Sequence, residues 1–328
     1  MDIHLTVLII IALAFDFLNG VHDSSNIVAT IISSRSLSPR AALMLTAISE
    51  FCGPFLFGVA VAKTVGSEII PPGLMTMPVL ISALTGAILW NIITWFLGVP
   101  SSSSHALIGG LIGATTAGVG FDVIQMSGLN KVFIALFLSP VIGLAAGFVF
   151  TRLVYVLAAS ASMKINLFFK RVQVLTGIGL ALSHGAIDAQ NTMGIITLGL
   201  VTTGALDSFE VPLWVIGISA LAIAMGTLSG GWRLIKTLGA GFFRVRPVHG
   251  FCAQMTSASV ILGAALLGGP VSTTQVVSSA ILGVGAADRV NKVRWHLAAN
   301  ILTAWLITIP LSGLMAAGTF VILTYAGI

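Results

Sequence analysis

Residues 19–26 read NGVHDSSN and interrupt an otherwise apolar part of the chain with a carboxylate, amides and hydroxyls. Residues 184–191, HGAIDAQN, repeat this pattern 165 positions later, with Gly, Asp and Asn in matching places. An ionisable side chain in a bilayer-spanning segment is energetically expensive unless it has a partner or water, which makes it a candidate functional group. These two stretches, the first and second cassettes, therefore predict a duplicated site within a membrane.

The composition excludes an ordinary soluble protein. Hydrophobic residues make up 57% of the 328 residues and charged residues only 8%, and the mean hydropathy is +1.07, so polar side chains are too few to cover a water-exposed surface. The net charge of +5 comes from basic residues that are dispersed between apolar runs, which does not predict nucleic-acid binding. Cys52 and Cys252 lie inside apolar runs without metal-ligand spacing. The chain is expected to be an all-α integral membrane protein.

Each cassette lies in an apolar segment that is too long for one ordinary span. Residues 3–33 would form a helix about 46 Å long, whereas the hydrocarbon core of a bilayer is about 30 Å thick. We therefore expect a broken helix whose unwound centre, near Gly20, faces protein or water. Residues 173–202 predict the same arrangement, with a break near Gly185.

The remaining apolar runs complete about five crossings in each half of the chain. An odd number makes the second half enter the membrane from the opposite side, which defines an inverted repeat. The predicted units are a first repeat, 1–151, a basic linker, 152–171, and a second repeat, 172–328. The other predicted spans are 41–61, 77–97, 105–120, 132–151, 211–231, 249–267, 275–288 and 295–325.

Lys and Arg accumulate in short cytoplasmic loops, and with these spans nearly all of them fall on one side. Only Lys63 and Lys131 fall on the other. Both termini are therefore predicted outside the cell and the linker 152–171 in the cytoplasm. The basic residues on the predicted cytoplasmic side are Arg35, Arg40, Arg152, Lys164, Lys170, Arg171, Arg233, Lys236, Arg244, Arg246, Arg289, Lys292 and Arg294.

A second duplicated motif follows each cassette at a distance of about 80 residues. Residues 98–105 read GVPSSSSH and residues 268–275 read GGPVSTTQ. Each motif begins with a Gly/Pro break and leads through hydroxyls into a new apolar helix, so Ser or Thr would cap that helix. Free amides, hydroxyls and the positive end of the helix dipole together suit an oxyanion. The predicted anion-binding residues of these re-entrant Ser/Thr loops are Ser101, Ser102, Ser103, Ser104, Ser272, Thr273 and Thr274.

Ser and Thr in membrane helices also bond backbone carbonyls or hold helices together without binding a ligand. The matched duplication of the loops favours an anion site over that alternative. The cassette carboxylates, Asp23 and Asp188, cannot attract an anion and need another role. They are predicted to bind a co-transported Na+ or to carry a proton, with Asn26 and Asn191 offering amide oxygens one helical turn away.

Other polar residues within the spans are weaker candidates. Glu50 lies in the middle of a span, either as a coupling carboxylate or as half of an ion pair. Asp16 would share a helix face with Asp23, for function or for a helix–helix hydrogen bond. The histidines are either proton carriers or hydrogen-bonded core residues. The supporting candidates are Asp16, Asn19, His105, His184, Gln190 and Gln254.

Together these elements resemble the inorganic phosphate transporter (PiT) family, and the resemblance covers essentially the whole chain. It rests on residues 15–23, FDFLNGVHD, and 183–191, SHGAIDAQN, on the two Ser/Thr loops, and on 305–310, WLITIP. The first cassette is most similar to the bacterial low-affinity branch. The resemblance implies uptake of inorganic phosphate by H+ or Na+ symport with alternating access, without a resident cofactor, by a homodimer that lies in the lipid bilayer of the plasma membrane. It also implies that the Asp/Asn motifs and the Ser/Thr loops build the ion and phosphate sites.

Three positions depart from the family pattern. Gln254 stands where the second-repeat relative of Glu50 is often Glu, Gln275 stands where the second loop usually ends in His, and Ile187 stands where Asn often precedes the Asp. These changes leave the coupling ion open. They also leave sulfate, the substrate of some bacterial relatives, as an alternative to phosphate, because sulfate differs from hydrogen phosphate chiefly in having no proton to donate.

Two other functional classes could also use these side chains. A channel could use the hydroxyls as a selectivity filter, but the buried carboxylates would repel an anion unless coupling ions neutralised them. A membrane hydrolase could use Ser, His and Asp, but a duplicated nucleophile would be redundant. A secondary transporter accounts best for both duplicated motifs.

Overall fold

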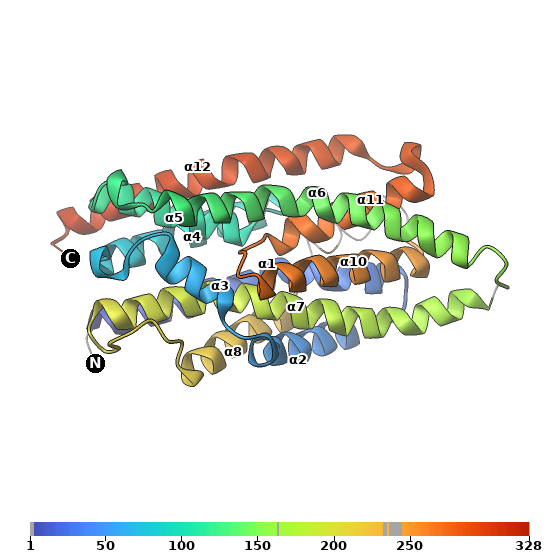
Figure 1. The fold of residues 1–328 in the computed structure, drawn as a ribbon, viewed down its shortest axis with the longest axis horizontal. Coiled ribbons are helices and arrows are strands. Elements are labelled where there is room, and N and C mark those ends of the chain that lie inside the picture. Colours follow the sequence, from blue (N-terminus) through green and yellow to red (C-terminus); the bar gives the residue numbers. More distant parts are fainter. Residues whose placement is uncertain (1–2, 163, 232–234, 236–244, 328) are drawn as a thin grey trace.

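In the computed structural model, residues 3–162, 164–231, 235 and 245–327 are described. Every regular element in these ranges is a helix (Figure 1). The α-helices are α1 (Ile3–Ser33), α2 (Pro39–Phe57), α3 (Ala60–Lys63), α4 (Met77–Leu97), α5 (Ser103–Gly118), α6 (Met126–Leu157), α7 (Ile165–Thr202), α8 (Leu213–Ser229), α10 (Pro247–Leu266), α11 (Thr273–Arg289) and α12 (Trp295–Tyr325). Short 3-10 or π turns are η1 (Thr64–Glu68), η2 (Pro72–Leu74), η3 (Phe121–Val123) and η4 (Val290–Lys292).

The helices that carry the cassettes are continuous, so the predicted breaks near Gly20 and Gly185 are wrong. Helix α1 has 31 residues and α7 has 38. A helix longer than the hydrocarbon core can tilt or extend beyond it instead of unwinding. The cassettes are also buried against protein, so their polar side chains do not meet lipid.

The cassette glycines serve close helix packing. A Cβ at Gly20 would collide with the carbonyl oxygen of Ile223 on α8, and one at Gly185 would collide with the carbonyl oxygen of Glu50 on α2. Glycine is required at both positions because the facing backbone occupies the place of a side chain. The cassettes thus lie directly against the backbone of α8 and α2.

A real break occurs after α2. The helix ends at Gly58, whose φ of +77° is a conformation that favours glycine, and the chain restarts as α3 and the π-helical η1. The side-chain oxygen of Gln190 accepts hydrogen bonds from the backbone amides of Val61 and Ala62 at 2.8 and 3.2 Å. Gln190 therefore caps the restarted helix from the second cassette.

The Ser/Thr loops form the tips of two helical hairpins. Helices α5 and α11 have 16 and 17 residues and span about 24–26 Å, less than a hydrocarbon core of about 30 Å. Among the described residues, six helices are long and apolar enough to cross a membrane by length and composition, and Leu213–Ser229 is a shorter apolar helix. Figure 1 shows α4 and α5 toward one end of the molecule and α10 and α11 toward the other.

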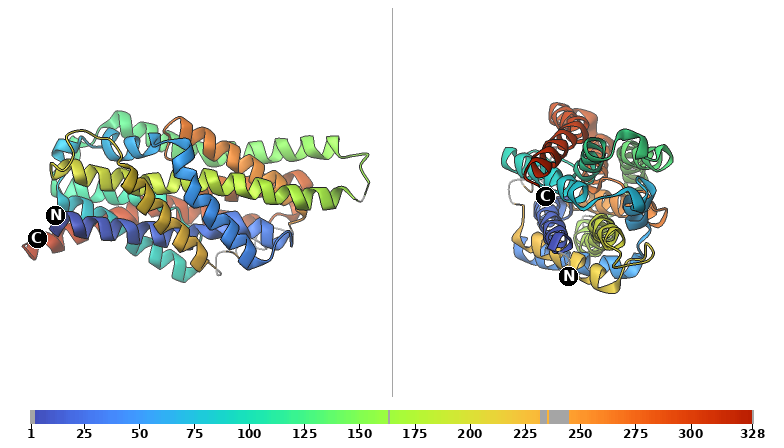
Figure 2. Two further views of the ribbon diagram at one scale, coloured as in Figure 1. Left: turned by 90° about the horizontal axis from the view of Figure 1, so that it is seen from below. Right: turned by 90° about the vertical axis from the view of Figure 1, so that its left-hand side faces the viewer.

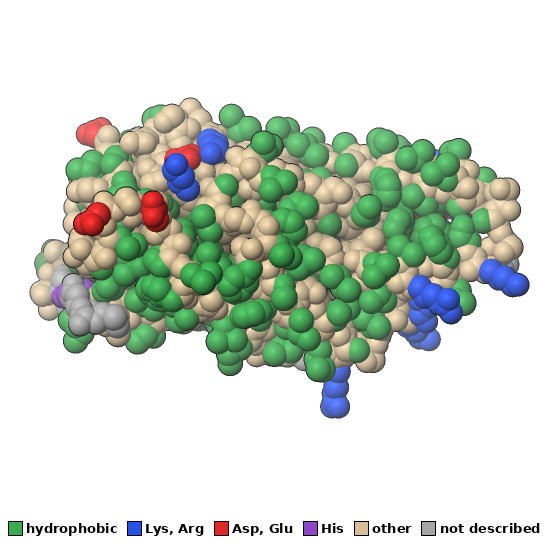
Figure 3. Space-filling view, turned by 60° about the horizontal axis from the view of Figure 1, so that its bottom comes forward, with side chains coloured by type: hydrophobic (Ala, Val, Ile, Leu, Met, Phe, Trp, Pro, Cys, Tyr) green, Lys and Arg blue, Asp and Glu red, His purple; other side chains and the backbone are tan. Residues whose placement is uncertain are grey.

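The two chain ends lie together at one end of this multi-pass membrane protein, and the connection between α6 and α7 lies at the other (Figures 1 and 2). On the face in Figure 3, Asp and Glu side chains gather near the termini and most Lys and Arg lie toward the opposite half. Helix α6 extends to residue 157 and α7 starts at residue 165, so both enter the predicted linker 152–171. The side chains of Arg233, Lys236, Arg244 and Lys292 lie outside the described parts.

Helix packing corresponds between the two halves. Helix α1 packs on α8 as α7 packs on α2, and α5 packs on α12 as α11 packs on α6. Each helix named here thus packs mainly on a helix of the other half. Two related repeats would produce this pattern, and their inverted relation remains a prediction.

Candidate functional site

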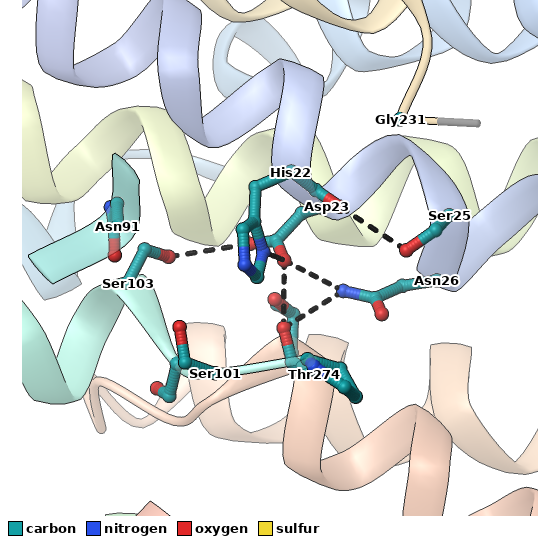
Figure 4. Close-up of polar contacts among 12 residues, drawn as sticks. His22, Asp23, Ser25, Asn26, Asn91, Ser101, Ser103, Gly231 and Thr274 are labelled. Atoms are coloured by element: carbon teal, nitrogen blue, oxygen red, sulfur yellow. Dashed lines mark hydrogen bonds and ion pairs between the residues drawn. The ribbon is translucent and has the colours of Figure 1, made fainter. Parts of the chain in front are cut away.

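The first cassette binds both Ser/Thr loops through Asp23 (Figure 4). Its carboxylate accepts hydrogen bonds from Ser103 at 3.2 Å, from Thr274 at 2.7 Å and from the Asn26 amide at 3.0 Å. His22 Nδ1 lies 3.2 Å from the same carboxylate. All five side chains are buried. One carboxylate thus holds the tips of the two hairpins together.

The second cassette forms the matching contacts. Thr273 donates to Asp188 at 3.1 Å, as Ser103 does to Asp23. The Asn191 amide donates to Ser104 at 3.2 Å, as the Asn26 amide does to Thr274 at 2.9 Å. In each half the Asp binds its own loop and the Asn binds the loop of the other half. The structure therefore brings the predicted residues into one composite site, composed of Asp23, Asn26, Asp188, Asn191, Ser103, Ser104, Thr273 and Thr274.

A second carboxylate joins the site through a histidine. His184 Nδ1 lies 2.9 Å from Glu50 Oε1, and His184 Nε2 lies 3.0 Å from Asp188 Oδ2, with all three side chains fully buried. Thr227 of α8 donates to the other oxygen of Glu50. Glu50 thus has His184 as a partner and contacts the composite site through it, and its roles as a coupling carboxylate and as half of an ion pair both remain predictions. No sequence pattern indicates Thr227.

Negative charge exceeds positive charge in this buried region. The carboxylates of Asp23, Glu50 and Asp188 face only His22 and His184 among the described ion pairs. Ligand atoms of Asp23, His184 and Asp188 all lie within 4.8 Å of one another. Uncompensated carboxylates are costly at this depth, so the arrangement suits a bound cation or added protons. Asn26 Oδ1 is buried and has no hydrogen-bond partner in the described part of the chain, and it is a suitable oxygen ligand for a small hard cation.

Asp16 and Asn19 lie buried on the same side of α1 as Asp23. No hydrogen bond of normal geometry reaches either side chain from a described residue. Thr192 of α7 is a polar neighbour of the Asp16 carboxylate across the helix interface, so a functional role and a helix–helix hydrogen bond both remain predictions for Asp16. Asn19 is the counterpart of His184 in the first half.

A serine of each loop caps the N-terminus of the helix that follows it, α5 or α11. Ser102 accepts a hydrogen bond from the amide of His105 at 3.1 Å, and Ser272 accepts one from the amide of Gln275 at 3.2 Å. Ser101 differs, since its hydroxyl lies 2.7 Å from that of Thr94 on α4. Both helix N-termini are buried at the site, so their free amides and dipoles favour a negatively charged ligand.

Gln254 does not occupy the structural position that corresponds to Glu50. It lies on α10 and bonds Thr30 at 3.0 Å and Thr176 at 2.8 Å. The backbone beside Gly185 is that of Glu50, and the backbone beside Gly20 is that of Ile223. The counterpart of Glu50 is therefore Ile223 on α8, and the second half has an apolar residue there.

Comparisons with known proteins place the chain among transporters. A family model described as "Phosphate transporter family" matches residues 19–316. The chain is 46% identical to a protein of Rhizobium meliloti (strain 1021), over 94% of the chain and 93% of the relative. It is 44% identical to a protein of Bacillus subtilis (strain 168), over 97% of both. Both relatives are named "Probable low-affinity inorganic phosphate transporter".

A solved structure named "The sodium-dependent phosphate transporter" has the same fold, with a TM-score of 0.89. The similarity covers 99% of this chain and 100% of that one at 23% sequence identity. At this level of identity the match shows a shared fold.

Proposed function

Because the chain belongs to the phosphate transporter family, we propose that it imports inorganic phosphate by symport with H+ or Na+. The family consists of transporters, not enzymes. The observation that carries the proposal is the composite site, in which each cassette bonds the Ser/Thr loops of both halves. Moving one half against the other would change these contacts, as alternating access requires.

The anion would bind between the N-termini of α5 and α11. These helices begin at Ser103 and Thr273, in the loops that the cassettes hold. Free amides and two helix dipoles there compensate negative charge without a buried Lys or Arg. The predicted ligands remain the hydroxyls and amides of the loops 101–104 and 272–274.

The cation would neutralise the carboxylates beside the anion. The oxygen-rich surroundings of Asp23 suit Na+. The contacts that join Glu50, His184 and Asp188 suit a proton instead, because imidazole exchanges protons and both nitrogens of His184 face carboxylates. Cation and anion would then bind cooperatively, since each reduces the electrostatic cost of the other. This coupling distinguishes a symporter from a channel.

Phosphate fits this site better than sulfate. Asp23 and Asp188 receive hydrogen bonds from the loop residues Ser103 and Thr273, so a carboxylate lies next to each predicted anion-binding loop. Hydrogen phosphate can donate its proton to such an acceptor and sulfate cannot. An ion without that donor would leave the carboxylate facing another negative charge.

Membrane orientation and assembly follow as further parts of the proposal. The end that carries the termini would face outward and the α6–α7 connection would face the cytoplasm, supported by the charge distribution in Figure 3. The location would be the plasma membrane. A homodimer in the lipid bilayer remains an expectation from the family resemblance.

Uptake into proteoliposomes tests the proposal. Labelled phosphate and labelled sulfate are offered separately, with inward H+ and inward Na+ gradients imposed one at a time. One proton per phosphate across one pH unit supports about ten-fold accumulation, because a pH unit corresponds to about 1.4 kcal/mol. We expect phosphate to accumulate under one of the gradients, with sulfate much weaker.

Protein-free liposomes and vesicles treated with an ionophore are the controls. Flux that only equilibrates phosphate under both gradients would indicate a channel, which cannot couple. Preferential accumulation of sulfate would contradict the proposed substrate.

A further inference from the structure

The six hydroxyls at the starts of α5 and α11 have different acceptors. Ser103 and Thr274 donate to Asp23, Thr273 donates to Asp188, and Ser104 donates to the carbonyl of Val271 at 3.5 Å. Four of the six hydroxyl protons therefore point at protein oxygens.

The two capping serines are different. Ser102 and Ser272 use their oxygens as acceptors for backbone amides. Among the described residues, the Ser272 hydroxyl proton has no acceptor, and the one candidate acceptor for the Ser102 proton is His105 Nδ1. A hydroxyl can donate one hydrogen bond while its oxygen accepts others. Of these six, Ser102 and Ser272 are thus the hydroxyls left to donate to an anion.

Ser102 has a further contact that decides which way its proton points. His105 Nδ1 lies 2.7 Å from Ser102 Oγ, and His105 Nε2 lies 3.2 Å from the side-chain nitrogen of Gln275. An amide nitrogen can only donate, so His105 Nε2 must accept. In a neutral imidazole the proton is then on Nδ1, which donates to Ser102 Oγ. The Ser102 hydroxyl consequently cannot donate to His105.

We propose that Gln275 is a positioning residue for anion binding. By donating to His105 Nε2 it fixes the Nδ1–H tautomer, and this leaves the Ser102 hydroxyl as a donor toward the anion. The inference rests on the proposed function and adds one determinant of affinity to it. It also links the hairpins, since Gln275 lies in the first turn of α11 and His105 in the first turn of α5.

The same tautomer explains why Ser102 and His105 are not a nucleophile and base. A histidine that activates a serine must accept the serine proton. Here the nitrogen that faces Ser102 carries a proton of its own, and an amide occupies the other nitrogen. The contact therefore orients a donor and performs no chemistry.

Gln275→Met removes the amide donor and preserves much of the side-chain volume. Without it, His105 can adopt the other tautomer and take the Ser102 proton, so the anion loses a hydrogen bond. In proteoliposomes we expect KM for phosphate to rise about five-fold with Vmax within about two-fold, the pattern of lost ligand binding. Gln173→Met is the matched control, because Gln173 is a buried glutamine that bonds Ser34 and Ser36 instead, and its KM should be unchanged.

The tautomer itself is measured by nitrogen NMR on protein with 15N-labelled histidine. The His105 signals are assigned by their loss in His105→Asn. Wild-type protein should show a protonated Nδ1 and an unprotonated Nε2, and Gln275→Met should shift this population toward Nε2–H. A wild-type Nε2–H tautomer, or an unchanged phosphate KM in Gln275→Met, would overturn the inference. Failure of wild-type protein to accumulate phosphate would instead refute the proposed function, whatever the tautomer.

Discussion

Asp23→Asn and Asp188→Asn are each expected to reduce concentrative phosphate uptake at least about 100-fold while the protein remains folded. Each carboxylate accepts hydrogen bonds from loop hydroxyls, and an amide keeps the size but removes the charge that binds Na+ or the proton. Loss of one partner in a buried charged cluster costs about 3–5 kcal/mol, and each 1.4 kcal/mol is a factor of ten. The cation would then no longer support the anion.

The measurement is gradient-driven accumulation in proteoliposomes, with circular dichroism and thermal unfolding as tests of folding. Asp122→Asn is the control for a neutralised carboxylate, since Asp122 is exposed in the short turn η3, and its uptake should stay within about two-fold of wild type. Accumulation like that of wild type in both cassette variants would eliminate their proposed role.

His184→Asn is expected to have a comparable effect through a different route. The imidazole lies between two carboxylates, with Nδ1 at 2.9 Å from Glu50 Oε1 and Nε2 at 3.0 Å from Asp188 Oδ2. Its removal leaves these two buried carboxylates facing each other. One must then take up a proton or the cluster must rearrange, at a cost of several kcal/mol. We expect about a 100-fold loss of uptake and a lower unfolding temperature.

The double variant Glu50→Ile with His184→Asn also tests the role of the Glu50–His184 pair in uptake. It is expected to be more stable than His184→Asn alone, because no uncompensated Glu50 carboxylate remains. It gives this part of the site the residues of its counterpart, where Asn19 and Ile223 occupy the equivalent positions. We expect the unfolding temperature to recover and phosphate exchange at equal concentrations to continue. Uptake driven by a pH gradient should stay absent. Restored pH-driven accumulation would show that the Glu50–His184 pair carries no coupling proton.

Local patterns predicted much of the architecture. The helices that follow each Ser/Thr loop begin at Ser103 and Thr273, near the predicted starts at 105 and 275, because Gly/Pro breaks and capping hydroxyls mark helix starts. The cassettes were also identified by composition, since Asp and Asn are rare in apolar spans. The predicted unwinding at Gly20 failed because a glycine in a helix can serve close packing as well as a break.

Long-range contacts could not be predicted from spacing. The approach of His184 to Glu50 depends on the packing of α7 on α2, and the hydrogen bond from Thr227 depends on α8. Neither contact leaves a periodic signal in the sequence. The family resemblance pairs Gln254 with Glu50, whereas helix packing assigns that position to Ile223.

Binding linkage tests most directly the central claim that one composite site couples cation and anion. Calorimetry on purified protein measures the Kd for phosphate as Na+ is varied, and as pH is varied at constant concentration of the phosphate dianion. Linkage is reciprocal, so we expect the coupling cation to tighten phosphate binding at least about ten-fold, and Asp23→Asn or Asp188→Asn to remove that dependence. A phosphate Kd that is independent of both Na+ and pH would contradict a coupled site.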